Sequence, residues 1–260
     1  MSESNQAIHP TAVIHPKAQI AEGVEIGPFS VIEQHVSIDE GTVVGPHVVI
    51  NGHTTIGKNN HFYQFSSIGE ANQDKKYKGE PTQTIIGDNN IIRESCTIHR
   101  GTTQDRQVTS IGNDNLLMAY THIAHDCHIG SNIIIANSSN IAGHVVIDDW
   151  AILGGFSGVH QFCRIGAHAF LGIRSHVTQD ILPFTLFAEG SPRSINVEGI
   201  KRRGFTKEQI SLLRKAYKII FRQGLRIEEA LDAISELTDS SDVLKTLVDF
   251  IQASERGISR

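Results

Sequence analysis

A hydrophobic residue recurs at every sixth position along most of this chain of 260 residues. An amphipathic helix needs spacings of three and four and a single strand needs a spacing of two, so neither explains a strict six. A parallel β-helix does, because each hexapeptide forms one flat side of a prism and points one side chain inward. The inward residues are Ile8, Ile14, Ile20, Ile26, Ile32, Ile38, Val44, Ile50, Ile56, Phe62 and Ile68, then Ile86, Ile92 and Ile98, and, after a slip of one residue, Ile111, Leu117, Ile123, Ile129, Ile135, Ile141, Ile147, Leu153, Val159, Ile165, Leu171 and Val177.

The residue four places after each inward residue is mostly small, and glycine often follows the inward residue directly, as expected where the backbone turns tightly. Cys96, Cys127 and Cys163 all fall at this small position, which predicts buried structural thiols and not catalytic groups. Three hexapeptide sides close one coil of 18 residues. About nine coils at ~4.8 Å each predict a prism roughly 45 Å long.

Two polar segments, residues 69–85 and 99–110, interrupt the repeat and are expected to leave the prism as loops. In the first, Lys75, Lys76 and Lys78 beside Asp74 form a compact cationic patch. The second could equally be a tolerated surface insertion.

Beyond Val177 the repeat decays and helical signals replace it. Thr206 and Gln209 have the spacing of a capping box, apolar residues then follow on one helical face, and Gly224 is a suitable stop. Two more amphipathic stretches lie near residues 227–237 and 242–253. We therefore predict a mainly β protein, with a parallel β-helix over residues 1–190 and a small α-helical domain over residues 191–260.

Composition excludes several classes of protein. With 39% hydrophobic and 20% charged residues the chain is in the globular range, and a net charge of -5 gives no global basic field for nucleic acid. No apolar stretch is long enough to span a membrane, and the first residues lack the basic and apolar regions of an export signal. We expect a cytoplasmic protein without stable membrane insertion, whose anionic partners are held by local basic clusters such as Lys201, Arg202 and Arg203.

Histidines gather in one zone of the repeat, in the segments HIAHDCH (122–128), AGH (142–144) and HQF (160–162). With 18 residues per coil, His125, Gly143 and Gln161 stack in one column, each about 5 Å above the next. His144 and His160 flank that column.

This column suits acyl transfer to a hydroxyl. Histidine can accept a proton at neutral pH, and Asp126 beside His125 would hold its tautomer and stabilise the imidazolium. The backbone N–H of Gly143, one coil away, could stabilise a developing oxyanion. Two other classes remain open: a zinc-dependent hydratase on the same prism, to which Gly143 would be useless, and a catalytically silent β-helix used for binding.

Seven motifs are more specific than the repeat: VVINGHTTIG (48–57), NQDKKYKGEPT (72–82), IRESCTIHRGT (92–102), DNLLMAYTHIAHDC (114–127), AGHVVIDDWAILGG (142–155), VHQFCRIGAH (159–168) and NVEGIKRRGF (196–205). With them the chain resembles the bacterial UDP-N-acetylglucosamine O-acyltransferases. The resemblance implies left-handed coils and transfer of an (R)-3-hydroxyacyl group from acyl carrier protein to the sugar 3-hydroxyl of UDP-N-acetylglucosamine, the first step of lipid A synthesis. It also implies a homotrimer with active sites between subunits, and no metal or bound cofactor, since phosphopantetheine arrives on the donor.

Carried over by position, the resemblance makes His125 the catalytic base, Asp126 its support and the Gly143 amide the oxyanion donor. The residues that would contact sugar, diphosphate or acyl chain are Gln73, Asp74, Lys76, His122, His144, His160 and Gln161. Asn196, Glu198 and Arg202 would lie on the nucleotide side. The connector at 189–199 is shorter than the family's, which weakens the assignments there.

Ile173 is predicted to limit the length of the acyl chain. It lies 48 residues after His125, which is eight hexapeptides or ~13 Å along the prism axis. At ~1.3 Å per carbon, a chain running from His125 reaches that height after about ten carbons. Family members with glycine at this position would leave the groove open, so Ile173 favours donors of about 10 to 12 carbons. The alternative is that Ile173 only packs against a neighbouring coil.

Overall fold

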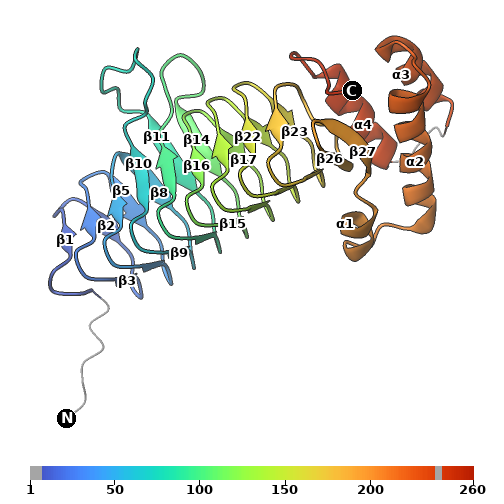
Figure 1. The fold of residues 1–260 in the computed structure, drawn as a ribbon. Coiled ribbons are helices and arrows are strands. Elements are labelled where there is room, and N and C mark those ends of the chain that lie inside the picture. Colours follow the sequence, from blue (N-terminus) through green and yellow to red (C-terminus); the bar gives the residue numbers. More distant parts are fainter. Residues whose placement is uncertain (1–7, 238–241) are drawn as a thin grey trace.

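The computed structural model describes residues 8–237 and 242–260 (Figure 1). The first seven residues lie outside the described part. The predicted start of the β-helix domain at residue 1 and the prediction that no export signal is present both concern these residues. Short strands form three sheets, of nine, eight and ten strands, that are the three faces of a prism. Nine strands in the first sheet agree with the prediction of about nine coils.

As far as β25 (His176–Val177), each face is made of every third strand in chain order, and β26 (Thr185–Ala188) and β27 (Ser191–Ile195) both add to the third face. The first face consists of β1 (Val13–Ile14), β4 (Val31–Ile32), β7 (Val49–Ile50), β10 (Ser67–Glu70), β13 (Thr97–His99), β16 (His122–Ile123), β19 (Asn140–Ile141), β22 (Gly158–Val159) and β25 (His176–Val177). The second consists of β2 (Gln19–Ile20), β5 (Val36–Ile38), β8 (His53–Ile56), β11 (Gln83–Ile86), β14 (Val108–Ile111), β17 (His128–Ile129), β20 (Val146–Ile147) and β23 (Arg164–Ile165). The third consists of β3 (Glu25–Ile26), β6 (Val43–Val44), β9 (His61–Phe62), β12 (Ile91–Ile92), β15 (Leu116–Leu117), β18 (Ile134–Ile135), β21 (Ile152–Leu153), β24 (Phe170–Leu171), β26 (Thr185–Ala188) and β27 (Ser191–Ile195).

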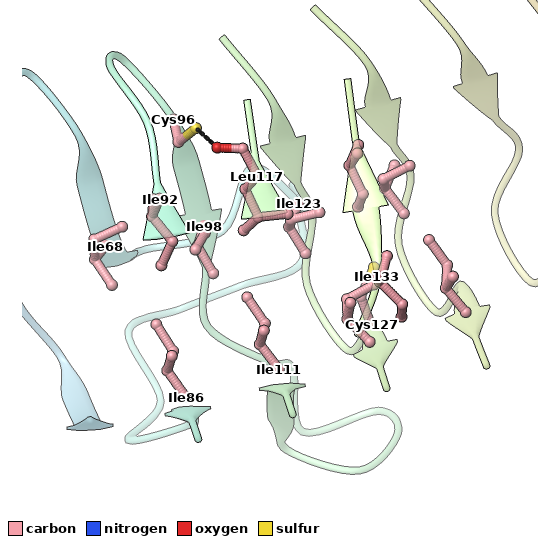
Figure 2. Packing of buried hydrophobic residues seen from close by; sticks show 14 of the residues in the cluster. Ile68, Ile86, Ile92, Cys96, Ile98, Ile111, Leu117, Ile123, Cys127 and Ile133 are labelled. Atoms are coloured by element: carbon pink, nitrogen blue, oxygen red, sulfur yellow. Dashed lines mark hydrogen bonds between the residues drawn. The ribbon is translucent and has the colours of Figure 1, made fainter. Parts of the chain in front are cut away.

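The inward hydrophobic residues form the core of the prism. Parallel pairing places Ile123 beside Ile141 and Ile141 beside Val159, which is the predicted spacing of one coil. Every predicted inward residue from Ile26 to Val177 is at most 2% exposed. Figure 2 shows part of this stack, with two of the three cysteines inside it, and all three thiols are buried as predicted.

Among the described residues, the first coil has no neighbour on its outer side. Ile8 is 41% exposed, and Ile14 and Ile20 are only partly buried. The core of the prism therefore closes fully only from Ile26 onward.

The corners between faces have a repeated backbone geometry. Residues in the left-handed region recur along all three edges of the prism, and Asp126 (φ 58°), His144 (φ 64°) and Phe162 (φ 65°) follow one another at the corner between the first and second faces. At another corner the buried side chains of Asn60 and Asn90 are hydrogen bonded to each other at 2.9 Å, which ties adjacent coils together.

Both interruptions leave the prism as loops, as predicted, but the loops are shorter than the predicted segments: residues 71–82 join β10 to β11, and residues 100–107 join β13 to β14. The outer residues of both predicted segments belong to these strands. Figure 1 shows the two loops projecting side by side from the middle of the prism. They lie above the corner that follows the first face, which is the corner that holds Asp126 and His144.

Four helices, α1 (Val197–Arg202), α2 (Lys207–Arg222), α3 (Ile227–Ser235) and α4 (Asp242–Gln252), cover the end of the prism opposite to the N-terminus (Figure 1). The capping box of Thr206 and Gln209 is present at the start of α2, as predicted. Leu213, Ile220 and Leu247 belong to a separate apolar core among these helices. No helix of the described residues has both the length and the apolar character needed to cross a bilayer.

The junction of prism and helices is a hairpin. β26 and β27 pair antiparallel, unlike every other strand pair in the described sheets. The predicted boundary between residues 190 and 191 falls at the start of β27, so this strand of the third face comes from the segment assigned to the helical domain. The Arg203 guanidinium lies 4.9 Å from the centre of the Trp150 ring and adds a contact between helices and prism.

Candidate active site

An open groove of about 890 Å³ runs along the first face beside the corner of Asp126. Strands β16, β19 and β22 form its floor, and the 71–82 loop forms one wall. Nine of the predicted residues line it: Gln73, Asp74, Lys76, His122, His125, Gly143, His144, His160 and Gln161.

His125 and Asp126 form a hydrogen-bonded pair at the edge of this groove. Nδ1 of His125 lies 2.9 Å from Oδ2 of Asp126, and the Asp126 side chain is fully buried while that of His125 is 17% exposed. An ionised carboxylate can only accept, so Nδ1 carries the proton and Nε2 is left as an acceptor in the groove. This is the orientation that a general base requires.

The Asp126 carboxylate is held in its ionised form. Burial works to raise its pKa, but hydrogen bonds from His125 and from the backbone and hydroxyl of Thr102 outweigh burial and lower the pKa. Its oxygens accept from the Thr102 N–H at 3.0 Å and from Thr102 Oγ1 at 2.7 Å. The carboxylate is therefore available as the negative partner of a protonated His125.

Gly143 lies directly against the His125 ring. A Cβ at Gly143 would come within 2.6 Å of Cε1 and 2.8 Å of Nε2 of His125, closer than real Cβ contacts. Among the described residues no carbonyl accepts a hydrogen bond from the Gly143 N–H. A free donor beside Nε2 is the arrangement that an oxyanion site needs.

Three other histidines of the groove also have Nδ1 occupied, which leaves Nε2 for a ligand. Nδ1 of His122 lies 2.7 Å from Thr97 Oγ1, that of His144 lies 2.6 Å from Asp105 Oδ2, and that of His160 lies 3.2 Å from the Gln161 carbonyl oxygen. Burial, followed by the proximity of His125, lowers the pKa of His122. A neutral His122 can therefore either donate or accept at its Nε2, according to its tautomer.

Several groove residues were not predicted. Asn140, Gly158 and His176 line the groove in one column with His122, at the spacing of one coil. The period of 18 residues per coil is therefore enough to predict that they stack on His122. His99, Gln104 and Phe162 line it as well. Burial lowers the pKa of His99 to about 4.

Four predicted residues lie away from the groove of their own chain. Ile173 is 69% exposed at the corner between the third and first faces. Asn196 is buried as the N-cap of α1: its Oδ1 accepts from the Gly199 N–H and its Nδ2 donates to the His168 carbonyl. Glu198 pairs with Lys201 at 3.2 Å on the same helix, which also carries Arg202. None of the four therefore lines the groove of its own chain.

His125, Asp126 and His144 are also close enough together to share a metal ion, with one ligand atom of each within 4.8 Å of the others. Two imidazoles and a carboxylate are a donor set that suits zinc. However, the Asp126 oxygens already accept from His125 and Thr102, and a metal would have to displace these bonds.

Comparisons with known proteins agree over nearly the whole chain. Residues 109–143 match the model of the bacterial transferase hexapeptide (six repeats), and residues 180–259 match domain 2 of UDP N-acetylglucosamine O-acyltransferase. The acyl-[acyl-carrier-protein]--UDP-N-acetylglucosamine O-acyltransferase of Janthinobacterium sp. (strain Marseille) is 58% identical, over 97% of this chain and 99% of that protein. The enzyme of the same name from Ectopseudomonas mendocina is 56% identical over 98% and 99%.

Solved structures give the same result. The UDP-N-acetylglucosamine acyltransferase of Francisella novicida superposes with a TM-score of 0.95 at 48% identity, covering 97% of this chain and 94% of that one. The UDP-N-acetylglucosamine O-acyltransferase of Moraxella catarrhalis gives a TM-score of 0.94 at 43% identity, covering 98% and 100%.

Stacked hexapeptides that carry a histidine–carboxylate pair in a groove, together with the match to the hexapeptide model, define a hexapeptide-repeat transferase. Within that class the chain belongs to the UDP-N-acetylglucosamine O-acyltransferase family, and it is an acyltransferase. The likeness over the full length confirms the left-handed coil with its helical C-terminus, and it decides against the zinc hydratase and the silent binding protein.

Proposed function

We propose that the protein transfers an (R)-3-hydroxyacyl chain from acyl carrier protein to the 3-hydroxyl of UDP-N-acetylglucosamine, the first step of lipid A biosynthesis. The names of the relatives give the donor carrier and the acceptor. The observation that carries the proposal is the position of His125 Nε2 beside the free N–H of Gly143, with Asp126 behind the ring. The cytoplasmic location stays a prediction.

In the proposed mechanism, a named residue assists each step of the reaction. His125 Nε2 takes the proton of the sugar hydroxyl as its oxygen forms a bond to the thioester carbonyl carbon, and Asp126 stabilises the imidazolium. The Gly143 N–H binds the resulting oxyanion. When the intermediate collapses, the carbon–sulfur bond breaks and the leaving thiolate takes the proton back from His125. The sugar ester and the free thiol of the carrier are the products.

The acceptor is anionic, and the loop beside the groove supplies cations. Lys75 and Lys76 line the groove from the 71–82 loop and can pair with the diphosphate. An assay with UDP-N-acetylglucosamine and a series of 3-hydroxyacyl carrier proteins tests the proposal directly. Absence of ester formation with every donor would refute it.

This reaction needs neither metal nor bound cofactor, because the base is a histidine and phosphopantetheine arrives with the donor. We therefore expect full activity after exhaustive dialysis against EDTA, measured in metal-free buffer. Loss of activity on dialysis, with recovery on adding Zn²⁺, would place a metal at His125, Asp126 and His144 and contradict this part of the proposal.

A homotrimer is supported by the outer surface of the third face. An apolar column runs along it, with one residue exposed and the others partly buried: Ile91, Leu116, Ile134, Ile152 and Phe170. A continuous apolar column on the outer surface of a face is typical of a contact surface. Packing of a neighbouring copy on this face would also bring Ile173 and the α1 residues of one copy toward the groove of the other. Analytical ultracentrifugation should give the mass of a trimer, and a fully active monomer would contradict this arrangement.

Replacing Ile173 by glycine should shift the donor preference to longer chains. If Ile173 of a neighbouring subunit closes the acyl groove, the wild type prefers donors of about 10 to 12 carbons and the variant accepts 14 carbons at least as well. Relative kcat/KM values for 10-, 12- and 14-carbon donors measure this. Unchanged selectivity in a folded variant would mean that the chain ends elsewhere.

A further inference from the structure

The 100–107 loop interrupts the hexapeptide repeat, and its sequence alone is compatible with a simple surface insertion. The structure places part of it in the interior. Thr102 is only 3% exposed, and both its N–H and its hydroxyl donate to the Asp126 carboxylate. Asp105 of the same loop is hydrogen bonded to His144. The loop therefore contacts two adjacent coils at the site.

The backbone of this loop is fixed beside Thr102 by the other loop. The carbonyl of Gly101 accepts from Thr82 Oγ1 at 2.6 Å and from Asn72 Nδ2 at 2.9 Å, and its N–H donates to the Gln83 carbonyl at 3.2 Å. Asn72 and Thr82 are the two ends of the segment that carries Gln73, Asp74 and Lys76.

Gly101 also packs directly on the carboxylate. A Cβ at this position would lie 2.3 Å from the Val108 nitrogen and 2.8 Å from Asp126 Oδ1. Only glycine allows the loop to come this close. The contacts of Gly101 with the neighbouring loop and with Asp126 therefore fix the position of Thr102.

We propose that Thr102 is a positioning residue for the reaction: it holds the Asp126 carboxylate so that Oδ2 faces Nδ1 of His125. This rests on the proposed function. The terminal torsion of an aspartate side chain is broad, so burial alone does not set the rotation of the carboxylate. Two donors from Thr102 fix that rotation, and the carboxylate then fixes the tautomer of His125.

The test is Thr102→Val, which keeps the branched shape and removes the hydroxyl. We expect kcat to fall about 10-fold, the scale of a lost hydrogen bond to a charged group. KM for UDP-N-acetylglucosamine should stay unchanged, because Thr102 does not line the groove. Thr102→Ser should restore kcat, and Thr103→Val, at the exposed neighbouring position, is the matched control.

A double-mutant cycle separates positioning from general destabilisation. In an Asp126→Asn background, Thr102→Val should cause no further loss, because the carboxylate that it positions is gone. An additional 10-fold loss in that background, or wild-type kcat in a folded Thr102→Val protein, would overturn the proposal. If Thr102→Val does not fold, Thr102→Ala, which lacks the hydroxyl, can be compared with Thr102→Ser, which keeps it.

A readout that needs no turnover distinguishes this proposal from the proposed function. With ¹⁵N-labelled histidine, His125 of the wild type should show the Nδ1–H tautomer, and Thr102→Val should show a mixture of tautomers. A pure Nδ1–H tautomer in Thr102→Val would overturn the positioning role. A tautomer change in a protein that transfers no acyl group would leave the positioning intact and refute the function.

Discussion

Replacing His125 by alanine should lower kcat by roughly 10²-fold or more without unfolding the protein. In the proposed mechanism His125 accepts the proton of the sugar hydroxyl, while its position at a corner, two residues after the inward Ile123, keeps it out of the core of the prism. Steady-state kinetics and a thermal unfolding curve measure the two effects separately.

His128→Ala is the matched control for this variant. His128 lies on the second face, is exposed, and is hydrogen bonded to Ser110 and not to any groove residue. We expect it to keep wild-type turnover. A folded His125→Ala protein with near-normal kcat would show that some other group is the base.

Gly143→Ala should reduce kcat by about 10²-fold, although it removes no functional group. The backbone of Gly143 is not in the left-handed region, so alanine fits its conformation. The new Cβ would collide with the His125 ring and push Nε2 away from the acceptor hydroxyl. The thermal unfolding midpoint should change little, because only a side chain at the groove has to move.

The effect of Gly143→Ala should depend on the ring of His125. In a His125→Ala background there is nothing to collide with, so the added methyl group should cost no further activity. Equal losses in both backgrounds would mean that the methyl group acts on the substrate or on the amide itself.

The prism and its main column of site residues could be predicted because their spacing is local and repeated. An inward residue at every sixth position needs no knowledge of the rest of the fold, and one coil of 18 residues places Gly143 beside His125 and Gln161 beyond it. The same spacing places Asn140, Gly158 and His176 in one column with His122, although only His122 was predicted as a site residue.

The roles of Thr102, Asp105 and Asn196 could not be predicted. The two loop residues reach Asp126 and His144 only because Asn72 and Thr82, far away in sequence, fix the loop at Gly101. The resemblance implies a nucleotide contact for Asn196, yet both ends of its amide are bonded within the chain: Oδ1 caps α1 and Nδ2 donates to the His168 carbonyl. That helix has only six residues, too few for an amphipathic pattern to be visible.

The unequal ends of the prism have a consequence for local stability. Each coil is bonded only to its neighbours, so the free energy of opening is a sum of nearest-neighbour contributions. In the part of the chain that the structure describes, the first coil, with Ile8 exposed, lacks one neighbour, whereas the last coils are covered by the helices. Opening should therefore start at the N-terminal end and progress coil by coil. The coils that carry His125 and Gly143 lie well inside, so the chain can fray reversibly at one end while the groove keeps its shape.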